Sequence, residues 1–135
     1  MFTLEKIREA HSRVKSGADF PAYIQDIKKL GVLSYEHFVS DGHILYHGHS
    51  GFILAAPAKW NSVPIAPAAQ KENLHQEIKI HQQGKTDYPT FCRQAAEDGV
   101  EKWVVDMQKM MCTYYGLSGE EMFAEPIPEA RAYSN

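Results

Sequence analysis

Two stretches of 34 residues decide the fold, because one aligns with the other without a gap. Residues 18–51 read ADFPAYIQDIKKLGVLSYEHFVSDGHILYHGHSG, and residues 86–119 read TDYPTFCRQAAEDGVEKWVVDMQKMMCTYYGLSG. Eight of the aligned positions are identical, whereas ordinary residue frequencies would give roughly two. Several of the matches are glycine or proline, which fix backbone geometry at turns and helix ends. The identical pairs are Asp19/Asp87, Pro21/Pro89, Gly31/Gly99, Val32/Val100, Tyr46/Tyr114, Gly48/Gly116, Ser50/Ser118 and Gly51/Gly119.

The similarity extends upstream, where each copy is preceded by apolar residues at helical spacing. Gly17 and Gly84 are placed to end these two preceding helices. We therefore predict an internal duplication of a unit of about 67 residues. The expected repeats are residues 1–56 and 68–126, joined by a proline-rich linker at 57–67 and followed by a loosely held tail at 127–135. Together they would form one domain over residues 1–135.

Each unit reads as two helices followed by three strands. Short turns between consecutive strands, such as Ser40-Asp41-Gly42, predict antiparallel pairing and hence an α+β fold with helices packed on the sheet. The expected helices cover about 4–16, 20–30, 70–83 and 87–97. The expected strands cover 32–39, 43–48, 52–56, 100–107, 110–116 and 121–125.

Composition limits the classes of partner. The formal net charge is −3 and the charges are interspersed, so no basic stripe is available to neutralise nucleic-acid phosphates. No apolar stretch approaches the roughly 20 residues that a membrane span needs. The N-terminal stretch is charged from residue 5 and has no apolar signal-peptide core, which predicts a cytoplasmic protein without membrane contact.

Three histidines in ten residues, within GHILYHGHSG at 42–51, raise the question of a metal site. His43, His47 and His49 share parity and would face the same side of one strand. Against a metal site, Gly48 interrupts the strand, and the aligned positions hold Met111, Tyr115 and Leu117. We predict no metal and no cofactor, with these histidines as the weak candidates.

Two cysteines occupy positions that are isoleucine in the first copy. Cys92 aligns with Ile24 and Cys112 with Ile44, so both are predicted to be core thiols. The alternative is a catalytic cysteine, which would require an exposed thiol of low pKa beside a histidine.

The aromatic residues of the strands suggest the other candidate site. Trp103 and Tyr114 read as core residues, yet with Tyr115 and His47 they could line a ligand-binding cleft between the repeats. No motif for a catalytic nucleophile, a phosphate-binding loop or a zinc protease is present, and we assign no catalytic residue.

The stretches GADFPAYIQDIKKLGVLSYEHFVSDG and DGVEKWVVDMQKMMCTYYG, with the closing EPIP, resemble a known family over nearly the whole chain. This is the domain-of-unknown-function family 1398, a set of short enterobacterial, often prophage-encoded proteins that includes YdfO and YbcV. The resemblance implies a prophage-type origin, and the family supplies no catalytic residues to carry over.

Two functions follow as hypotheses. The first is a non-enzymatic accessory protein that binds a host or phage protein, with a homodimer as a further assembly because duplicated units pair readily. The alternative is a small-molecule binder or hydrolase that uses a cleft between the two repeats. A DNA-binding regulator would need a basic face that the sequence lacks.

Overall fold

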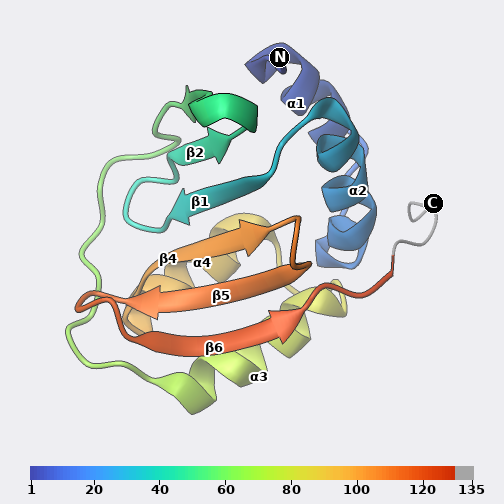
Figure 1. Ribbon diagram of the computed structural model, residues 1–135. Helices are drawn as coiled ribbons and strands as arrows, with labels where there is room; N and C mark the ends of the chain where they lie inside the picture. The colour runs from blue at the N-terminus through green and yellow to red at the C-terminus, as the bar shows by residue number, and fades with distance from the viewer. Residues whose placement is uncertain (130–135) are drawn as a thin grey trace.

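A computed structural model describes residues 1–129, and within that range the predicted order of elements and the α+β class are confirmed (Figure 1). The first half contains α1 (Leu4–His11), the 3-10 helix η1 (Gly17–Asp19), α2 (Phe20–Leu30), β1 (Ser34–Phe38), β2 (Ile44–His47), the 3-10 helix η2 (His49–Gly51) and β3 (Ile53–Ala56). The second half contains α3 (Lys71–Gln82), α4 (Tyr88–Glu97), β4 (Val100–Asp106), β5 (Met111–Gly116) and β6 (Glu121–Pro126).

Helix α1 is shorter than predicted. It begins after Thr3, whose hydroxyl accepts a hydrogen bond from the Lys6 amide (3.2 Å), and it ends at His11 rather than near residue 16. The Ser12 hydroxyl donates to the Glu9 carbonyl (2.5 Å), and such a bond offers the backbone an alternative to continued helix. Gly17 therefore does not end α1 but opens η1.

The aspartate–proline pairs open the second helix of each half, but the two aspartates act differently. Asp87 caps α4 by accepting from the Thr90 amide (2.8 Å), whereas Asp19 accepts from the Lys15 amide (2.8 Å) and holds the loop before α2. Gly31 ends α2 in the left-handed conformation, with φ of 108°, as its position predicted.

The six strands form one continuous antiparallel sheet in the order β3-β2-β1-β4-β5-β6. The two central strands, β1 and β4, come from different halves, and Glu36 pairs with Val104 in the middle of their ladder. The halves therefore meet through main-chain hydrogen bonds at the centre of the sheet, an arrangement that the sequence had left open.

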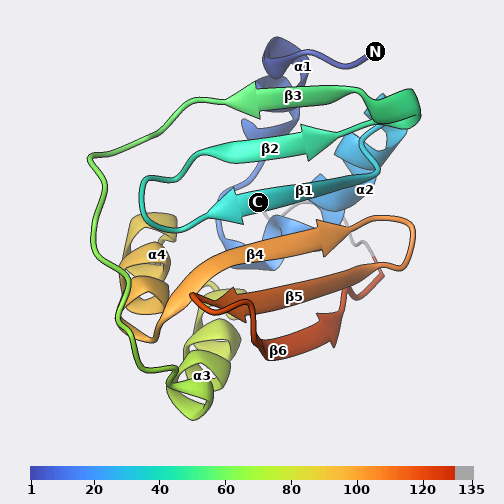
Figure 2. The same ribbon diagram turned by 60° about the vertical axis from the view of Figure 1, so that its left-hand side comes forward.

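The four α-helices lie on one face of this sheet, and Figure 2 shows the strands in front of them with the other face uncovered. Alternate residues of each strand point to the helices. They form the core together with the inner faces of the helices, where Ile24, Ile27, Leu74 and Ile78 are fully buried.

The two halves share strand register as well as element order. Tyr35 pairs with Tyr46 in the first half, and the aligned residues Trp103 and Tyr114 pair in the second. The third strands differ: Tyr115 pairs with Glu121 as His47 pairs with Ile53, but a bulge next to Tyr115 shifts the other pairs of β5 with β6 by one residue. The common origin of the halves stays a prediction.

The segment between the halves passes along the turn that joins β1 to β2. The amides of Lys59 and Val63 donate to the carbonyls of Asp41 and Ser40 (both 2.8 Å), and the Ala66 amide donates to the Ala96 carbonyl (2.9 Å).

In the predicted tail, Ile127 is buried and its amide donates to the Met110 carbonyl (2.8 Å). Residues 130–135 of that tail lie outside the described residues. Among the described helices, none is long and apolar enough to cross a membrane.

Candidate functional site

A cavity of about 770 Å³ lies between the helices and the sheet, where the two halves meet. Its wall draws on both halves: α1, α2, β1, β2 and the start of the linker on one side, and α3, α4, β4, β5 and β6 on the other. The volume falls within the roughly 300–1,000 Å³ typical of small-molecule sites.

The floor of the cavity is aromatic because the inward positions of the four middle strands carry large rings. Tyr35 and Tyr46 have their ring centroids 5.5 Å apart, and the aligned pair Trp103 and Tyr114 has a separation of 5.7 Å. Burial raises the pKa values of Tyr35 and Tyr114 well above the ordinary range, so these hydroxyls stay neutral. The floor therefore consists of aromatic ring surfaces and carries no charge.

His37 is the polar residue at the centre of this floor. It is 3% exposed, stacks on Trp103 with centroids 3.9 Å apart, and brings Nε2 into hydrogen-bond contact with the Tyr88 hydroxyl. Its Nδ1 has no hydrogen-bond partner. Burial, followed by the positive charge of Lys59, lowers the pKa of His37 to about 3, so the ring is neutral at physiological pH.

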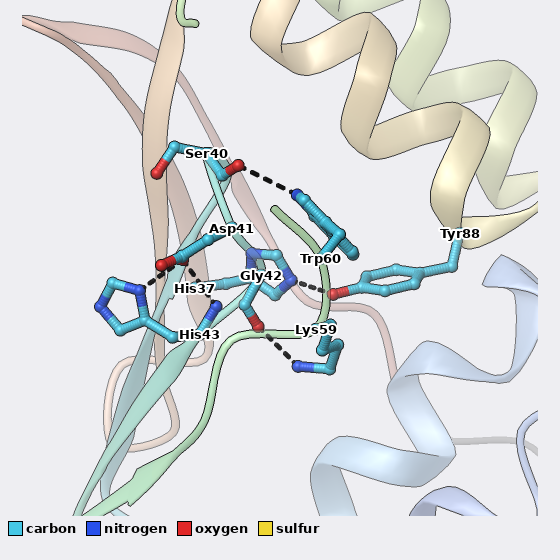
Figure 3. A network of polar contacts seen from close by, with 8 residues as sticks. All are labelled: His37, Ser40, Asp41, Gly42, His43, Lys59, Trp60 and Tyr88. Carbon is cyan, nitrogen blue, oxygen red and sulfur yellow. Dashed lines mark hydrogen bonds and ion pairs between the residues drawn. The ribbon is translucent and has the colours of Figure 1, made fainter. Parts of the chain in front are cut away.

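Tyr88 and the linker hold one end of the cavity together. Figure 3 shows the contact between His37 and Tyr88 passing between the side chains of Trp60 and Lys59. The Trp60 indole donates to the Ser40 carbonyl (3.0 Å), and Lys59 Nζ donates to the Gly42 carbonyl (2.6 Å). These two bonds fix the linker to the β1–β2 turn in the first half. The linker then lies beside Tyr88, the first residue of α4 in the second half.

Both cysteines are confirmed as core thiols, each 3% exposed. Cys112 forms part of the cavity wall, whereas Cys92 lies under Tyr88 on the same helix. Burial raises the pKa of each thiol to about 12, so both are protonated at neutral pH. Neither has the low pKa that a catalytic cysteine needs.

The four predicted ligand-binding residues do not form one site. Trp103 and Tyr114 line the cavity, but Tyr115 follows Tyr114 on β5 and points to the uncovered face. His47 also lies on that face, where its Nε2 contacts Glu36 Oε2 (2.9 Å), and Lys102 Nζ binds the other oxygen of Glu36 (2.8 Å).

The three candidate metal ligands, His43, His47 and His49, also do not form one site. His43 Nδ1 contacts Asp41 Oδ1 (2.6 Å), and its ring stacks on Phe38. His47 contacts Glu36, and His49 lies in η2 beyond the end of the strand. Across residues 1–129, no group of three or more histidine, cysteine, aspartate or glutamate side chains is arranged to hold a metal ion.

Sequence reasoning missed His37, Tyr88 and Lys59. A signal for His37 is present in the sequence: it has the same strand parity as the hydrophobic residues Tyr35 and Val39, and the aligned residue is Val105. Lys59 gave no signal, because its place at the cavity depends on the path that the linker takes.

Fold and site together define a two-layer α+β protein with a partly open cavity that has an aromatic floor. The chain belongs to the family described as proteins of unknown function, DUF1398, whose sequence model matches residues 8–126.

Two groups of relatives are similar to it. The uncharacterized protein YcgX of Escherichia coli K12 is 18% identical over 115 residues, which are 85% of this chain and 86% of that protein. The uncharacterized proteins Rv2012 of Mycobacterium tuberculosis and Mb2035 of Mycobacterium bovis are each 27% identical over 99 residues, 73% of this chain. The match spans only 60% of the length of each mycobacterial relative.

Proposed function

We propose that this protein binds a small molecule in the cavity between its two halves. The observation that carries the proposal is a cavity of about 770 Å³ whose floor is aromatic and includes one buried, neutral histidine. Specific small-molecule sites commonly pair an apolar wall with few polar groups.

The proposal is tested by a substitution that places a large side chain in the cavity from the edge strand β3. Ala56 on β3 lines the cavity, whereas the neighbouring Ala55 is exposed on the opposite face of the strand. We expect Ala56→Trp to block binding and the matched control Ala55→Trp to leave it intact. The measurement is amide chemical-shift change in nitrogen-15 NMR spectra during a screen with small aromatic fragments.

Two outcomes of this screen would overturn the proposal. The first is that no fragment shifts the amides of cavity residues in the unmodified protein. The second is that fragments bind equally well to Ala56→Trp and to Ala55→Trp. Retained spectral dispersion in both variants checks that each has folded.

The proposal concerns binding rather than bond cleavage. The hydrolase alternative needs an activated nucleophile, and the thiol in the cavity wall is held protonated by burial. The neutral His37 ring is already engaged by the Tyr88 hydroxyl through Nε2.

A protein-interaction module is the second candidate, and the uncovered face of the sheet favours it. Ile53 on the edge strand β3 is 57% exposed, and Leu45 and Tyr115 extend the same face. In this reading the protein is a cytoplasmic, prophage-type accessory factor, one domain of two duplicated repeats, that binds a host or phage protein or a second copy. Light scattering after size exclusion of the unmodified protein and of Ile53→Lys tests the homodimer.

A further inference from the structure

We infer that the ligand of the cavity is an organic anion with an aromatic or similarly apolar body. The body lies against the tyrosine and tryptophan floor, and the acidic group lies at the rim beside Arg8, Lys15 and Lys59. This inference rests on the proposed binding function and adds the chemical class of the ligand.

The interior of the cavity selects for an uncharged body. Tyr35, Trp103 and Tyr114 present ring faces and edges, while Ile7 and Ile44 add aliphatic surface. An ionised group placed there would be removed from water without an opposite charge to pair with it, which is costly. The charged part of any ligand must therefore remain near the rim.

The rim is positive. The cavity wall includes four exposed cations, Arg8, Lys15, Lys59 and Lys85. It includes two carboxylates, Asp87 and Glu125. Within residues 1–129, none of the four cations forms an ion pair with a carboxylate.

Both carboxylates of the wall are already engaged. Asp87 caps α4 through the Thr90 amide, and Glu125 accepts a hydrogen bond from Gln82 Nε2 (2.7 Å). Burial raises the pKa of Glu125. The unpaired cations therefore attract a ligand anion at the opening, which also raises the rate of association.

His37 is the buried polar residue of this interior. The ring is 3% exposed, stacks on Trp103 and contacts the Tyr88 hydroxyl through Nε2. It is a neutral part of the floor, so it adds no charge to the interior. The site thus offers an apolar, uncharged interior and an external cationic rim.

A matched pair of fluorescent probes separates charge from shape. The probes 1-anilinonaphthalene-8-sulfonate and N-phenyl-1-naphthylamine share one aromatic skeleton, and only the first carries a negative charge. We expect the sulfonate probe to bind about tenfold more tightly to the full chain in low salt, and this advantage to shrink as salt is added. Ala56→Trp should remove binding of both probes.

A charge variant with a matched control locates the effect. Arg8→Gln combined with Lys15→Gln should weaken binding of the sulfonate probe by about tenfold and leave the neutral probe unchanged. Lys59 is kept because its ammonium group also holds the linker through the Gly42 carbonyl. The control combines Lys6→Gln with Lys79→Gln, which removes two exposed cations from α1 and α3 outside the cavity wall. We expect the control to retain the affinity of the unmodified protein within about twofold.

The outcomes distinguish this inference from the function on which it rests. Equal binding of the two probes, with both lost in Ala56→Trp, would overturn the anion inference and support the cavity as a binding site. Failure of the sulfonate probe to bind, or its binding unaltered in Ala56→Trp, also overturns the inference. The fragment screen then decides separately whether the cavity binds any small molecule.

Discussion

His37 and Trp103 are direct partners in the pairing of β1 with β4, and their rings stack with planes only 12° apart. The pair joins the two halves at the centre of the sheet. Because His37 also contacts Tyr88 on α4, one side chain of the first half touches a strand and a helix of the second. A buried histidine in this position connects the integrity of the cavity floor to the protonation of a single ring.

We predict that His37 makes the protein less stable in acid. Burial lowers its folded pKa to about 3, below the unfolded value of 6.5, with Lys59, His43, Asp41 and Tyr88 as its polar neighbours. Between these values the unfolded chain binds more protons, so stability falls as pH drops from about 6.5 toward 3. His37→Phe should remove up to about 1.4 kcal/mol per pH unit of this slope.

Urea unfolding followed by circular dichroism at several pH values between 4 and 7.5 measures the slope. His49→Phe, an exposed substitution in η2, is the matched control and should keep the slope of the unmodified protein. Equal slopes for His37→Phe and the unmodified protein would show that the ring does not titrate with unfolding as described.

The sequence was sufficient to predict the order of elements because its signals are local. Proline and glycine at aligned positions fixed the helix starts and stops, and Gly31 acts as expected. Strand parity also indicates that Tyr114 and Tyr115 cannot line the same pocket wall, because neighbouring residues on a strand point to opposite faces. A cleft between the repeats was a hypothesis, but its size and most of its lining could not be predicted, because they depend on how α1 and α3 are spaced across the sheet. The end of α1 was missed because a serine hydroxyl competed with the helix.

A substitution at Gly17 should destabilise the protein by disturbing the contact between η1 and α3. A methyl group on Gly17 would collide with the backbone carbonyl of His81, at the contact of η1 with α3. We expect Gly17→Ala to cost about 1–3 kcal/mol, because backbone on both sides must shift. Gly51→Ala is the comparison: its φ of 76° gives strain of about 1 kcal/mol, and nothing lies within 4 Å of the added carbon. Thermal unfolding of both variants decides, and a smaller loss for Gly17→Ala would contradict the close packing.

The cysteines should resist labelling in the native protein. Burial raises both thiol pKa values to about 12, so at pH 8 the thiolate fraction is on the order of a thousandfold below that of the unfolded chain. We expect Ellman's reagent to react slowly with native protein and fast in urea. Cys92→Ser and Cys112→Ser assign any residual reaction. Rapid reaction of one native thiol would reopen the catalytic-cysteine alternative.

Glu77 on α3 and Asp98 at the end of α4 should make the protein less stable in alkali. Burial, followed by the neighbouring Asp98 carboxyl, raises the pKa of Glu77 to about 8, and burial also raises the pKa of Asp98. Because the folded state holds a proton that an unfolded glutamate releases near 4.5, this stability is complete below about pH 4.5 and is lost as pH rises through 8.

Glu77→Gln replaces the titrating group with a neutral amide of the same shape. We expect it to unfold at higher urea concentration than the unmodified protein at pH 9, with the two closer together at pH 5. Glu72→Gln, exposed on the same helix, removes the same charge and should not change the pH dependence. If Glu77→Gln and Glu72→Gln shift the midpoint equally at pH 9, the effect is general charge reduction, and the buried pair does not hold the proton.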